Sequence, residues 1–343
     1  MSQKNKYVLA VDIGGTKIAT SLVSFEGKVY CKRVIKTKPE GGREGIIEKI
    51  NGAIEKTMLD GKKKHITPMA IGIGCGGPLD SKKGIIHSPP NIKSLRNVPL
   101  RKIVQEKFKL PAFLENDANA AALAEHMFGA GKGTNDMIYI TWSTGIGGGI
   151  ILGGKLHQGK DNCAGEVGHQ VVLVGGHLCG CGKRGCLEAE ASGSAIANIG
   201  RETIKEMEKT NKKKTDKRKI ILNKIKIEKL TVLSKIKLEN LTARDIIDAA
   251  REGDRISIEI VNRAADFFGV GLANIIHILN LQMIVVGGGI SKAGDFVFRP
   301  AIKAFKRETK GWPQSDVEIR TSLLGDNIGD IGAAAAAIVG LRK

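Results

Sequence analysis

Hydrophobic and polar positions alternate along the N-terminal part of the chain in a way that predicts a mixed α/β arrangement. Three β-rich runs, KYVLAVDIGG, TKIATSLVSF and KVYCKRVIKT, are separated by GG and EGK, which predicts a meander of two hairpins. Helical spacing follows at Ile46, Ile50 and Ile54, and the apolar run ITPMAIGIGCGG predicts a buried strand. We expect a helix over residues 99–108, then a strand in PAFLEND that leads into the Ala-rich helix ANAAALAEHMFGAG.

The same pattern starts again at Asp136, where DMIYITWSTGIGGGIILGGKLHQG reads as strand, Gly-rich turn and strand. Helices are expected near 242–251, 254–280 and 292–309. The strands QMIVVGGG and DVEIRTS and a closing Ala-rich helix, IGDIGAAAAAIVG, complete this half. Two halves that each begin with a meander predict a duplicated α/β unit, and the cleft between such copies is where ligands bind.

Length and hydropathy agree with two globular domains. At roughly 150 residues per domain, 343 residues predict two. A hydrophobic content of 42% and a mean hydropathy of −0.09 are typical of a soluble protein. No window approaches the ~18 apolar residues of a spanning helix, and the N-terminus enters a strand without an apolar signal region. We therefore expect a cytoplasmic protein with no membrane partner.

The net charge of +19 raises the question of a polyanionic partner. Residues 201–240 alone hold 14 Lys or Arg against 6 Asp or Glu, which is +8 of the +19. We interpret this segment as a solvated, helical or partly disordered insertion, with a polyanion-binding arm as the alternative. Aromatic residues make up only 4% of the chain, which leaves little material for stacking on bases, so no nucleic-acid partner is expected.

The six cysteines do not predict a disulfide framework in a reducing compartment. Cys31, Cys75 and Cys163 stand among apolar or small neighbours and are expected to be small buried residues. The other three lie in the stretch GEVGHQVVLVGGHLCGCGKRGCLE.

In that stretch, the spacing of His169, Cys179, Cys181 and Cys186 suits a tetrahedral zinc site, and the intervening glycines let a short loop wrap an ion. Four protein ligands leave no open position, so such a zinc would be structural. His177 could compete with His169 as the nitrogen ligand. A redox pair would favour CxxC, an iron–sulfur cluster usually takes four thiolates, and unliganded thiols are the remaining alternative.

Glycine-rich turns follow three predicted strands: DIGGTK at residues 12–17, STGIGGG at 143–149 and GGGIS at 287–291. Consecutive backbone N–H groups in such turns can cradle phosphate oxygens, although hairpins need glycine in any case. The chain has no GxxxxGK[ST] motif, and no GxGxxG opens a helix after the first strand, so neither a P-loop nor a Rossmann unit is indicated.

In this order and spacing, the three turns resemble the nucleotide-binding turns of sugar kinases with the actin-like, ribonuclease-H-like ATPase fold. With ENDANAAALAE, GEVGH and CGCGKRGCLE, the chain resembles the ROK family of sugar kinases and repressors, and most of all its bacterial glucokinases, from about Tyr7 to Gly340. The resemblance implies two α/β domains, at 1–115 and 116–327, with an interdomain cleft. It also implies that the helix near 328–343 packs on the first domain, that residues 203–240 are an insertion, and that the protein is a homodimer.

The resemblance further implies ATP and Mg²⁺ as cofactors beside the structural Zn²⁺, with Asp12 holding Mg²⁺ through water. It assigns the nucleotide to residues of the three turns: Asp12, Gly14, Gly15, Thr16, Lys17, Thr144, Gly145, Gly147, Gly288 and Gly289. It makes Asp117 the base that takes the proton of the sugar 6-hydroxyl, where a helix N-cap is the plain alternative for an Asp. It assigns sugar hydroxyls to Asn91, Asn116, Glu166, His169 and Glu188.

The implied activity is ATP-dependent phosphorylation of a hexose at the 6-hydroxyl, with glucose as first choice. N-acetylmannosamine, N-acetylglucosamine, fructose and allose stay open, because family members commonly carry a Trp shortly after Asn91 and this chain reads NIKSLRNVPL there. Polyphosphate is a second donor to consider. A repressor of the same family would need a helix-turn-helix ahead of Tyr7, and the intact turns and Asp117 oppose a silent sugar sensor.

Overall fold

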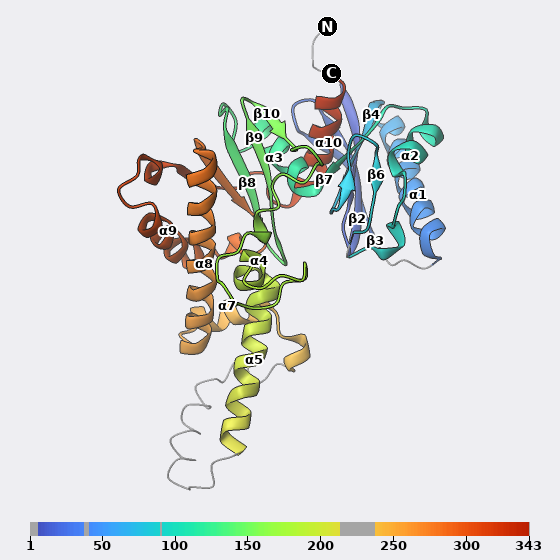
Figure 1. The fold of residues 1–343 in the computed structure, drawn as a ribbon. Coiled ribbons are helices and arrows are strands. Elements are labelled where there is room, and N and C mark those ends of the chain that lie inside the picture. The colour runs from blue at the N-terminus through green and yellow to red at the C-terminus, as the bar shows by residue number, and fades with distance from the viewer. Residues whose placement is uncertain (1–5, 38–40, 90, 213–236, 343) are drawn as a thin grey trace.

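The computed structural model describes residues 6–37, 41–89, 91–212 and 237–342, which form two lobes around two five-stranded sheets (Figure 1). The mixed α/β fold predicted from the sequence is confirmed. Residues 213–236 of the basic segment expected at 203–240 lie outside the described residues.

The first sheet has the strand order β3-β2-β1-β4-β7. Its strands are β1 (Tyr7–Ile13), β2 (Lys17–Ser24), β3 (Val29–Lys36), β4 (Pro68–Cys75) and β7 (Ala112–Asn116). The first three form the predicted antiparallel meander, and β4 and β7 run parallel to β1. Helix α1 (Gly42–Lys63) buries Ile46, Ile50 and Ile54 as its spacing predicts, and α2 (Leu100–Phe108) lies where a helix was expected.

The second sheet repeats this plan in the order β10-β9-β8-β11-β12. Its strands are β8 (Met137–Trp142), β9 (Ile146–Leu152), β10 (Lys155–His157), β11 (Met283–Gly287) and β12 (Glu318–Thr321). Again an antiparallel meander comes first and two parallel strands follow. The predicted duplication is therefore present at the level of strand order and direction.

The remaining helices are α3 (Asp117–Phe128), α4 (Leu187–Ala191), α5 (Gly193–Lys212), α7 (Ala243–Arg251), α8 (Arg255–Leu279), α9 (Asp295–Glu308) and α10 (Ile328–Gly340). Short 3₁₀ turns occur at Lys93–Leu95, Val167–His169, Leu238–Asn240, Ser291–Ala293, Pro313–Asp316 and Gly325–Asn327. Helix α5 extends away from both sheets (Figure 1), and residues 203–212 of the expected insertion are its continuation.

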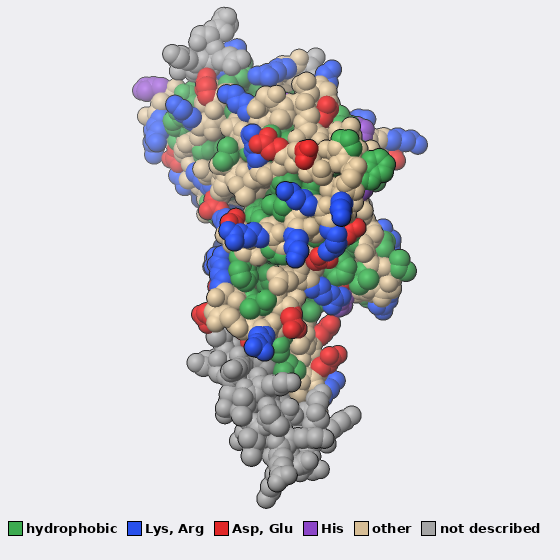
Figure 2. Space-filling model, turned by 90° about the vertical axis from the view of Figure 1, so that its left-hand side faces the viewer, with side chains coloured by type: hydrophobic (Ala, Val, Ile, Leu, Met, Phe, Trp, Pro, Cys, Tyr) green, Lys and Arg blue, Asp and Glu red, His purple; other side chains and the backbone are tan. Residues whose placement is uncertain are grey.

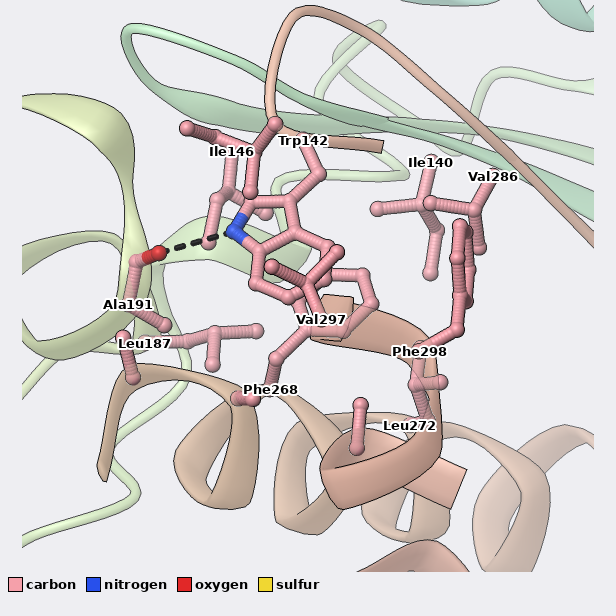
Figure 3. Close-up of a cluster of buried hydrophobic side chains, with 14 of the residues drawn as sticks. Ile140, Trp142, Ile146, Leu187, Ala191, Phe268, Leu272, Val286, Val297 and Phe298 are labelled. Carbon is pink, nitrogen blue, oxygen red and sulfur yellow. Dashed lines mark hydrogen bonds between the residues drawn. The ribbon is translucent and has the colours of Figure 1, made fainter. Parts of the chain in front are cut away.

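The core of the second lobe is built around Trp142 at the end of β8 (Figure 3). Its ring stacks on Phe268 of α8 with centroids 3.9 Å apart, and its indole N–H donates to the Ala191 carbonyl oxygen at 2.7 Å. Because Trp142 is fully buried and immediately precedes the 143–149 turn, this packing anchors the turn to α4 and α8.

Helix α10 packs between the two sheets, against β4, β1 and α3, and its alanines permit close approach. A Cβ atom on Gly72 of β4 would come within 1.8 Å of the Ala333 carbonyl oxygen, so only glycine allows this contact. The helix thus lies on the first sheet and on α3 at once, where the two lobes join (Figure 1). The domain division at residue 115 stays a prediction.

The structure adds one element that was not expected and corrects two expectations. The short hairpin of β5 (Leu79–Asp80) and β6 (Ile85–Ile86) has no apolar alternation long enough to predict it, and it forms by pairing across a turn at Gly84. The helix expected from 292 begins at Asp295, after a 3₁₀ turn. Cys75 is buried as expected, but Cys31 is only half-buried, and Cys163 is exposed because it lies in a loop that faces a cleft rather than the core.

On the face shown in Figure 2, Lys and Arg side chains are interspersed with acidic and apolar ones over the described residues. Among the described helices, none combines the length and apolar character needed to cross a lipid bilayer.

Candidate active site

A cavity of about 690 Å³ between the lobes brings together all six residues expected to contact a sugar: Asn91, Asn116, Asp117, Glu166, His169 and Glu188. They come from segments far apart in the chain. The 143–148 turn and the loop around Asn162 to Glu166 complete the walls. The cavity is therefore rich in amides and carboxylates, the groups that bind several hydroxyls at once, and we call it the sugar cavity.

Asn116 and Asp117 lie where strand β7 passes into helix α3, at the carboxyl end of the parallel part of the sheet. The N-cap is Asn116, whose Oδ1 accepts from the N–H groups of Ala118 at 2.9 Å and Asn119 at 3.2 Å. The alternative of Asp117 as N-cap is therefore wrong. Asp117 is the first helical residue, and its side chain is exposed to the cavity.

The carboxyl of Asp117 has a raised pKa because protein surrounds it deep in the cleft, although the N–H of Ala118 at 2.8 Å from Oδ1 acts in the opposite direction. A raised pKa makes the carboxylate a better proton acceptor. Asp117 therefore has both a raised pKa and a side chain that faces the polar walls of the cavity.

Glu115 lies behind this turn and was not among the site residues predicted from the sequence. Its buried carboxylate accepts from the Asn116 N–H at 2.9 Å and from Asn119 Nδ2 at 3.0 Å through Oε1. Its Oε2 accepts from Gln158 Nε2 at 2.7 Å. These bonds hold the Asn116–Asp117 turn in place, and an acidic residue inside an otherwise apolar strand is the signal that could have revealed them.

Glu188, in the first turn of α4, accepts a hydrogen bond from the Ile146 N–H at 2.9 Å through Oε2. A Cβ atom on the neighbouring Gly145 would come within 2.5 Å of the same oxygen. The glycine is therefore required for this carboxylate to reach the 143–149 turn.

His169, Cys179, Cys181 and Cys186 place their ligand atoms within 4.8 Å of one another. His169 Nδ1 lies 3.6 Å from Cys179 Sγ, and Cys181 Sγ lies 3.7 Å from Cys186 Sγ. Tetrahedral zinc, with Zn–S of about 2.3 Å and Zn–N of about 2.0–2.1 Å, requires separations of about 3.6 Å and about 3.8 Å for these pairs. The donor set and its spacing fit zinc.

His169 was expected both to bind the metal and to contact the sugar, and its two ring nitrogens allow it to do both. Nδ1 belongs to the cysteine cluster, and Nε2 lies 3.9 Å from Glu166 Oε2, toward the sugar cavity. The competing His177 is engaged elsewhere, since its ring Nδ1 and its backbone N–H lie 2.8 Å and 2.6 Å from the carboxylate oxygens of buried Glu190.

Half of the nucleotide residues expected from the three turns line two further cavities that adjoin the first. Asp12, Lys17, Gly288 and Gly289 line one of about 380 Å³ together with Asp117. Thr144 and Gly289 also line a cavity of about 560 Å³ between α5 and α7. Gly14, Gly15, Gly145 and Gly147 face the sugar cavity instead, and Thr144 lines that cavity as well.

Thr16 differs from its neighbours. It lies at the exposed tip of the β1–β2 hairpin, where its carbonyl accepts from the Thr37 N–H at 3.0 Å, and it lines none of the three cavities. Gly15 instead faces the sugar cavity, and a Cβ there would be 2.7 Å from that of Asn91.

Asp12 has a pKa raised to about 6, first by burial and then by the negative charges of Asp330 and Asp117. A bound divalent cation stabilises the ionised form of such a carboxylate, and carboxylate oxygens are the ligand type that Mg²⁺ prefers. Asp12 therefore fits the proposed magnesium role.

Lys292 was not predicted as a site residue, although it directly follows the GGGIS turn. It lines both nucleotide-side cavities, and its Nζ lies 2.6 Å from Asp326 Oδ1. The ammonium group lowers the pKa of Asp326. Because both side chains are exposed, this ion pair is weak and can be exchanged for a phosphate.

Comparison with known proteins agrees with this arrangement: the sequence pattern of the ROK family matches residues 8–339. The chain belongs to the ROK family. It is 35% identical over 328 residues to a glucokinase of Thermotoga maritima, covering 96% of each chain.

Two solved ROK structures are similar throughout. The ROK hexokinase from Thermus thermophilus has a TM-score of 0.79 and 34% identity, covering 98% of this chain and 99% of the other. A ROK family glucokinase from Streptomyces griseus in complex with glucose and AMPPNP has a TM-score of 0.77 and 34% identity, covering 96% and 98%.

Proposed function

We propose that the protein is an ATP-dependent kinase that transfers the γ-phosphoryl group to the 6-hydroxyl of glucose. The observation that carries this proposal is the shared wall of the cavities: Asp117 lines both the sugar cavity and the cavity formed by Asp12, Lys17 and the 287–289 glycines. A base between a hydroxyl-binding site and three glycine-rich turns is what phosphoryl transfer to a sugar needs.

In this mechanism, Asn91, Asn116, Glu166, His169 and Glu188 orient the sugar. Asp117 accepts the proton of the 6-hydroxyl while that oxygen bonds to the γ-phosphorus, and the bond from phosphorus to the β-bridging oxygen breaks to release ADP. Because the transition state is loose, alignment of the hydroxyl contributes more than base strength. Glu115 supports the alignment by holding the Asn116–Asp117 turn.

Mg²⁺ would neutralise phosphate charge, with Asp12 as the residue that holds it through water. Lys17 and Lys292 would contact phosphate oxygens, since both line the cavity next to Asp12, and the cavity between α5 and α7 would take the nucleoside. Zinc at His169 and the three cysteines would be structural, fixing the loop between Glu166 and Glu188. A cytoplasmic homodimer is part of the proposal, and sedimentation of the purified protein would test the dimer.

A coupled assay of ADP release with Mg-ATP, run across hexoses and N-acetylhexosamines, tests the function. Glucose should be turned over, and Asp117→Asn should lower kcat by at least ~10²-fold, the usual cost of losing a general base. Asp316→Asn, at an exposed carboxylate in a 3₁₀ turn, is the matched control and should behave as wild type.

Three outcomes would redirect the proposal. Turnover of only an amino sugar keeps the mechanism and changes the substrate. Turnover with polyphosphate but not ATP changes the donor. Sugar binding without turnover on any donor would contradict the kinase and favour a sensor.

A further inference from the structure

A fourth cavity, of about 580 Å³, lies at the junction of the lobes and has no role in the proposed reaction. We call it the hinge cavity. It is lined by residues of β7, β10, α3 and α10 and by the turn after β5, elements that gather around the junction (Figure 1). Its size is that of a small-molecule site.

Four cationic side chains surround the hinge cavity: Lys82, Arg101, Lys155 and Arg342. They come from the turn after β5, from α2, from β10 and from the turn after α10, so both lobes contribute. None of them forms an ion pair with a carboxylate in the part of the chain that the structure describes. Arg101 is held in place because its Nη1 donates to the Ser81 carbonyl oxygen at 3.3 Å.

The rest of the lining is divided between apolar and hydrogen-bonding groups. Phe113, Leu123, Leu156 and Val339 form apolar walls. Ser81, Glu115 and Gln158 form a polar floor, in which Gln158 Nε2 donates to Ser81 Oγ at 2.9 Å and to Glu115 Oε2 at 2.7 Å. A cationic rim selects an anion, and a floor of hydroxyl, amide and carboxylate groups selects hydroxyls.

We infer that the hinge cavity is a regulatory site for the phosphate monoester of a small polyol. The phosphate lies between the cations of the two lobes, and the hydroxyls of the ligand meet Ser81, Glu115 and Gln158. This is a second ligand site, separate from the cleft that holds Asp117, and it goes beyond the proposed kinase function.

The floor connects the hinge cavity to the sugar site. Glu115 Oε2 faces Gln158, and its Oε1 accepts from the Asn116 N–H at 2.9 Å. A ligand that binds cations of both lobes and the Gln158–Glu115 pair therefore changes how the lobes close and how the Asn116–Asp117 turn is held. Its binding and sugar binding must then affect each other by the same factor.

Calorimetric titration of the full-length protein with ribose 5-phosphate tests the site, with ribose and inorganic phosphate as probes of each half of the ligand. We expect millimolar or tighter binding of ribose 5-phosphate and weaker binding of either part. Arg101→Gln combined with Lys155→Gln should weaken binding at least about tenfold, the cost of a lost charge-assisted hydrogen bond. Lys155→Gln alone, at an exposed side chain, should give a smaller loss and covers the case in which the double variant does not fold.

Two control variants distinguish binding in the hinge cavity from general charge attraction and from binding in the active cleft. Lys102→Gln removes a neighbouring exposed charge of α2 outside the cavity, and Lys292→Met alters the nucleotide side. Both should bind ribose 5-phosphate as wild type does. An equal loss of ribose 5-phosphate affinity in Lys102→Gln would mean general charge attraction. A loss of that affinity in Lys292→Met would mean that the probe binds in the active cleft. Either result, or no binding to wild type at all, would overturn the inference. Because the readout is binding, it is independent of whether glucose is phosphorylated.

Discussion

The carboxylate of Glu188 and the backbone N–H of Ile146 are joined by a hydrogen bond of 2.9 Å. Glu188 is two residues past Cys186, the last member of the Cys₃His cluster, and Ile146 belongs to the 143–149 turn. This one bond connects the proposed zinc loop, the proposed sugar cavity and a turn expected to bind phosphate. Disturbance at any of the three is therefore expected to reach the other two.

Two substitutions of Glu188 distinguish its hydrogen bond with the Ile146 N–H from its proposed contact with the sugar. Glu188→Gln retains an oxygen that can accept from Ile146, whereas Glu188→Ala removes both interactions. We expect kcat/KM for the sugar to fall about tenfold in the Gln variant and about a hundredfold or more in the Ala variant, since hydrogen bonds to charged groups contribute about 1.5–3 kcal/mol. Steady-state kinetics measures this, and equal losses in the two variants would contradict the role of the Ile146 bond.

Metal removal should disable the sugar side before the nucleotide side. We expect one zinc per chain by elemental analysis, released by chelation or in Cys181→Ser, with a lower Tm and a strongly weakened sugar affinity. Nucleotide binding should be weakened less than sugar binding, because two of the three turns, at residues 12–17 and 287–291, lie outside the loop. Cys31→Ser, at a half-buried thiol outside the cluster, should keep its metal. Full metal loss without change in sugar affinity would contradict the proposed positioning role.

Much of the fold could be predicted because each half of the chain carries its own regular pattern. The apolar runs of β1, β4, β8 and β11 and the spacing of Ile46, Ile50 and Ile54 specify buried faces locally. The Cys₃His cluster could be predicted because its four donors lie within eighteen residues of a single Gly-rich loop. The six residues expected to contact a sugar followed from family resemblance, and the structure brings them together in one cavity.

Features that depend on contacts between distant segments could not be predicted. Glu115 stands out in the sequence as an acidic residue in an apolar strand, but its partner Gln158 follows a strand of the other sheet, and only the fold brings the two together. Lys292 is an ordinary surface lysine in sequence, and only the fold brings it between two cavities and beside Asp326. The exposure of Cys163 likewise follows from the cleft and not from its neighbours in sequence.

Asp12 predicts opposite effects on stability and on activity. Its folded pKa of about 6 exceeds the ordinary 3.8, so at pH 7 the ionised carboxylate destabilises the ligand-free fold. Asp12→Asn should raise the free energy of unfolding at pH 7 by about 1–3 kcal/mol while strongly reducing Mg²⁺-dependent turnover.

The pH dependence of this effect has a definite sign. As pH falls from about 6 to 3.8, the folded wild type takes up a proton that the unfolded chain does not, so wild type gains stability relative to Asp12→Asn. The advantage of the variant should shrink through this window and vanish below it, as urea unfolding at several pH values would measure. Turnover of wild type should fall as pH drops through about 6. An advantage independent of pH would contradict the assignment of the shift to Asp12.

Lys292 and Asp326 predict a pair of variants with different consequences. In the ligand-free protein the ammonium group lies 2.6 Å from the Asp326 carboxylate, and ATP phosphates would compete for it. Lys292→Met should raise KM for ATP and lower kcat, together a loss of about 10- to 1000-fold in kcat/KM, because a cation at the transferring phosphate stabilises the transition state. Asp326→Asn frees the ammonium group, so KM for ATP should stay the same or fall.

In Lys292→Met, the additional Asp326→Asn change should not lower KM for ATP, since its effect depends on the lysine. If Asp326→Asn instead impairs catalysis as much as Lys292→Met does, the carboxylate is itself part of the reaction and the exchange of partners proposed for Lys292 is wrong.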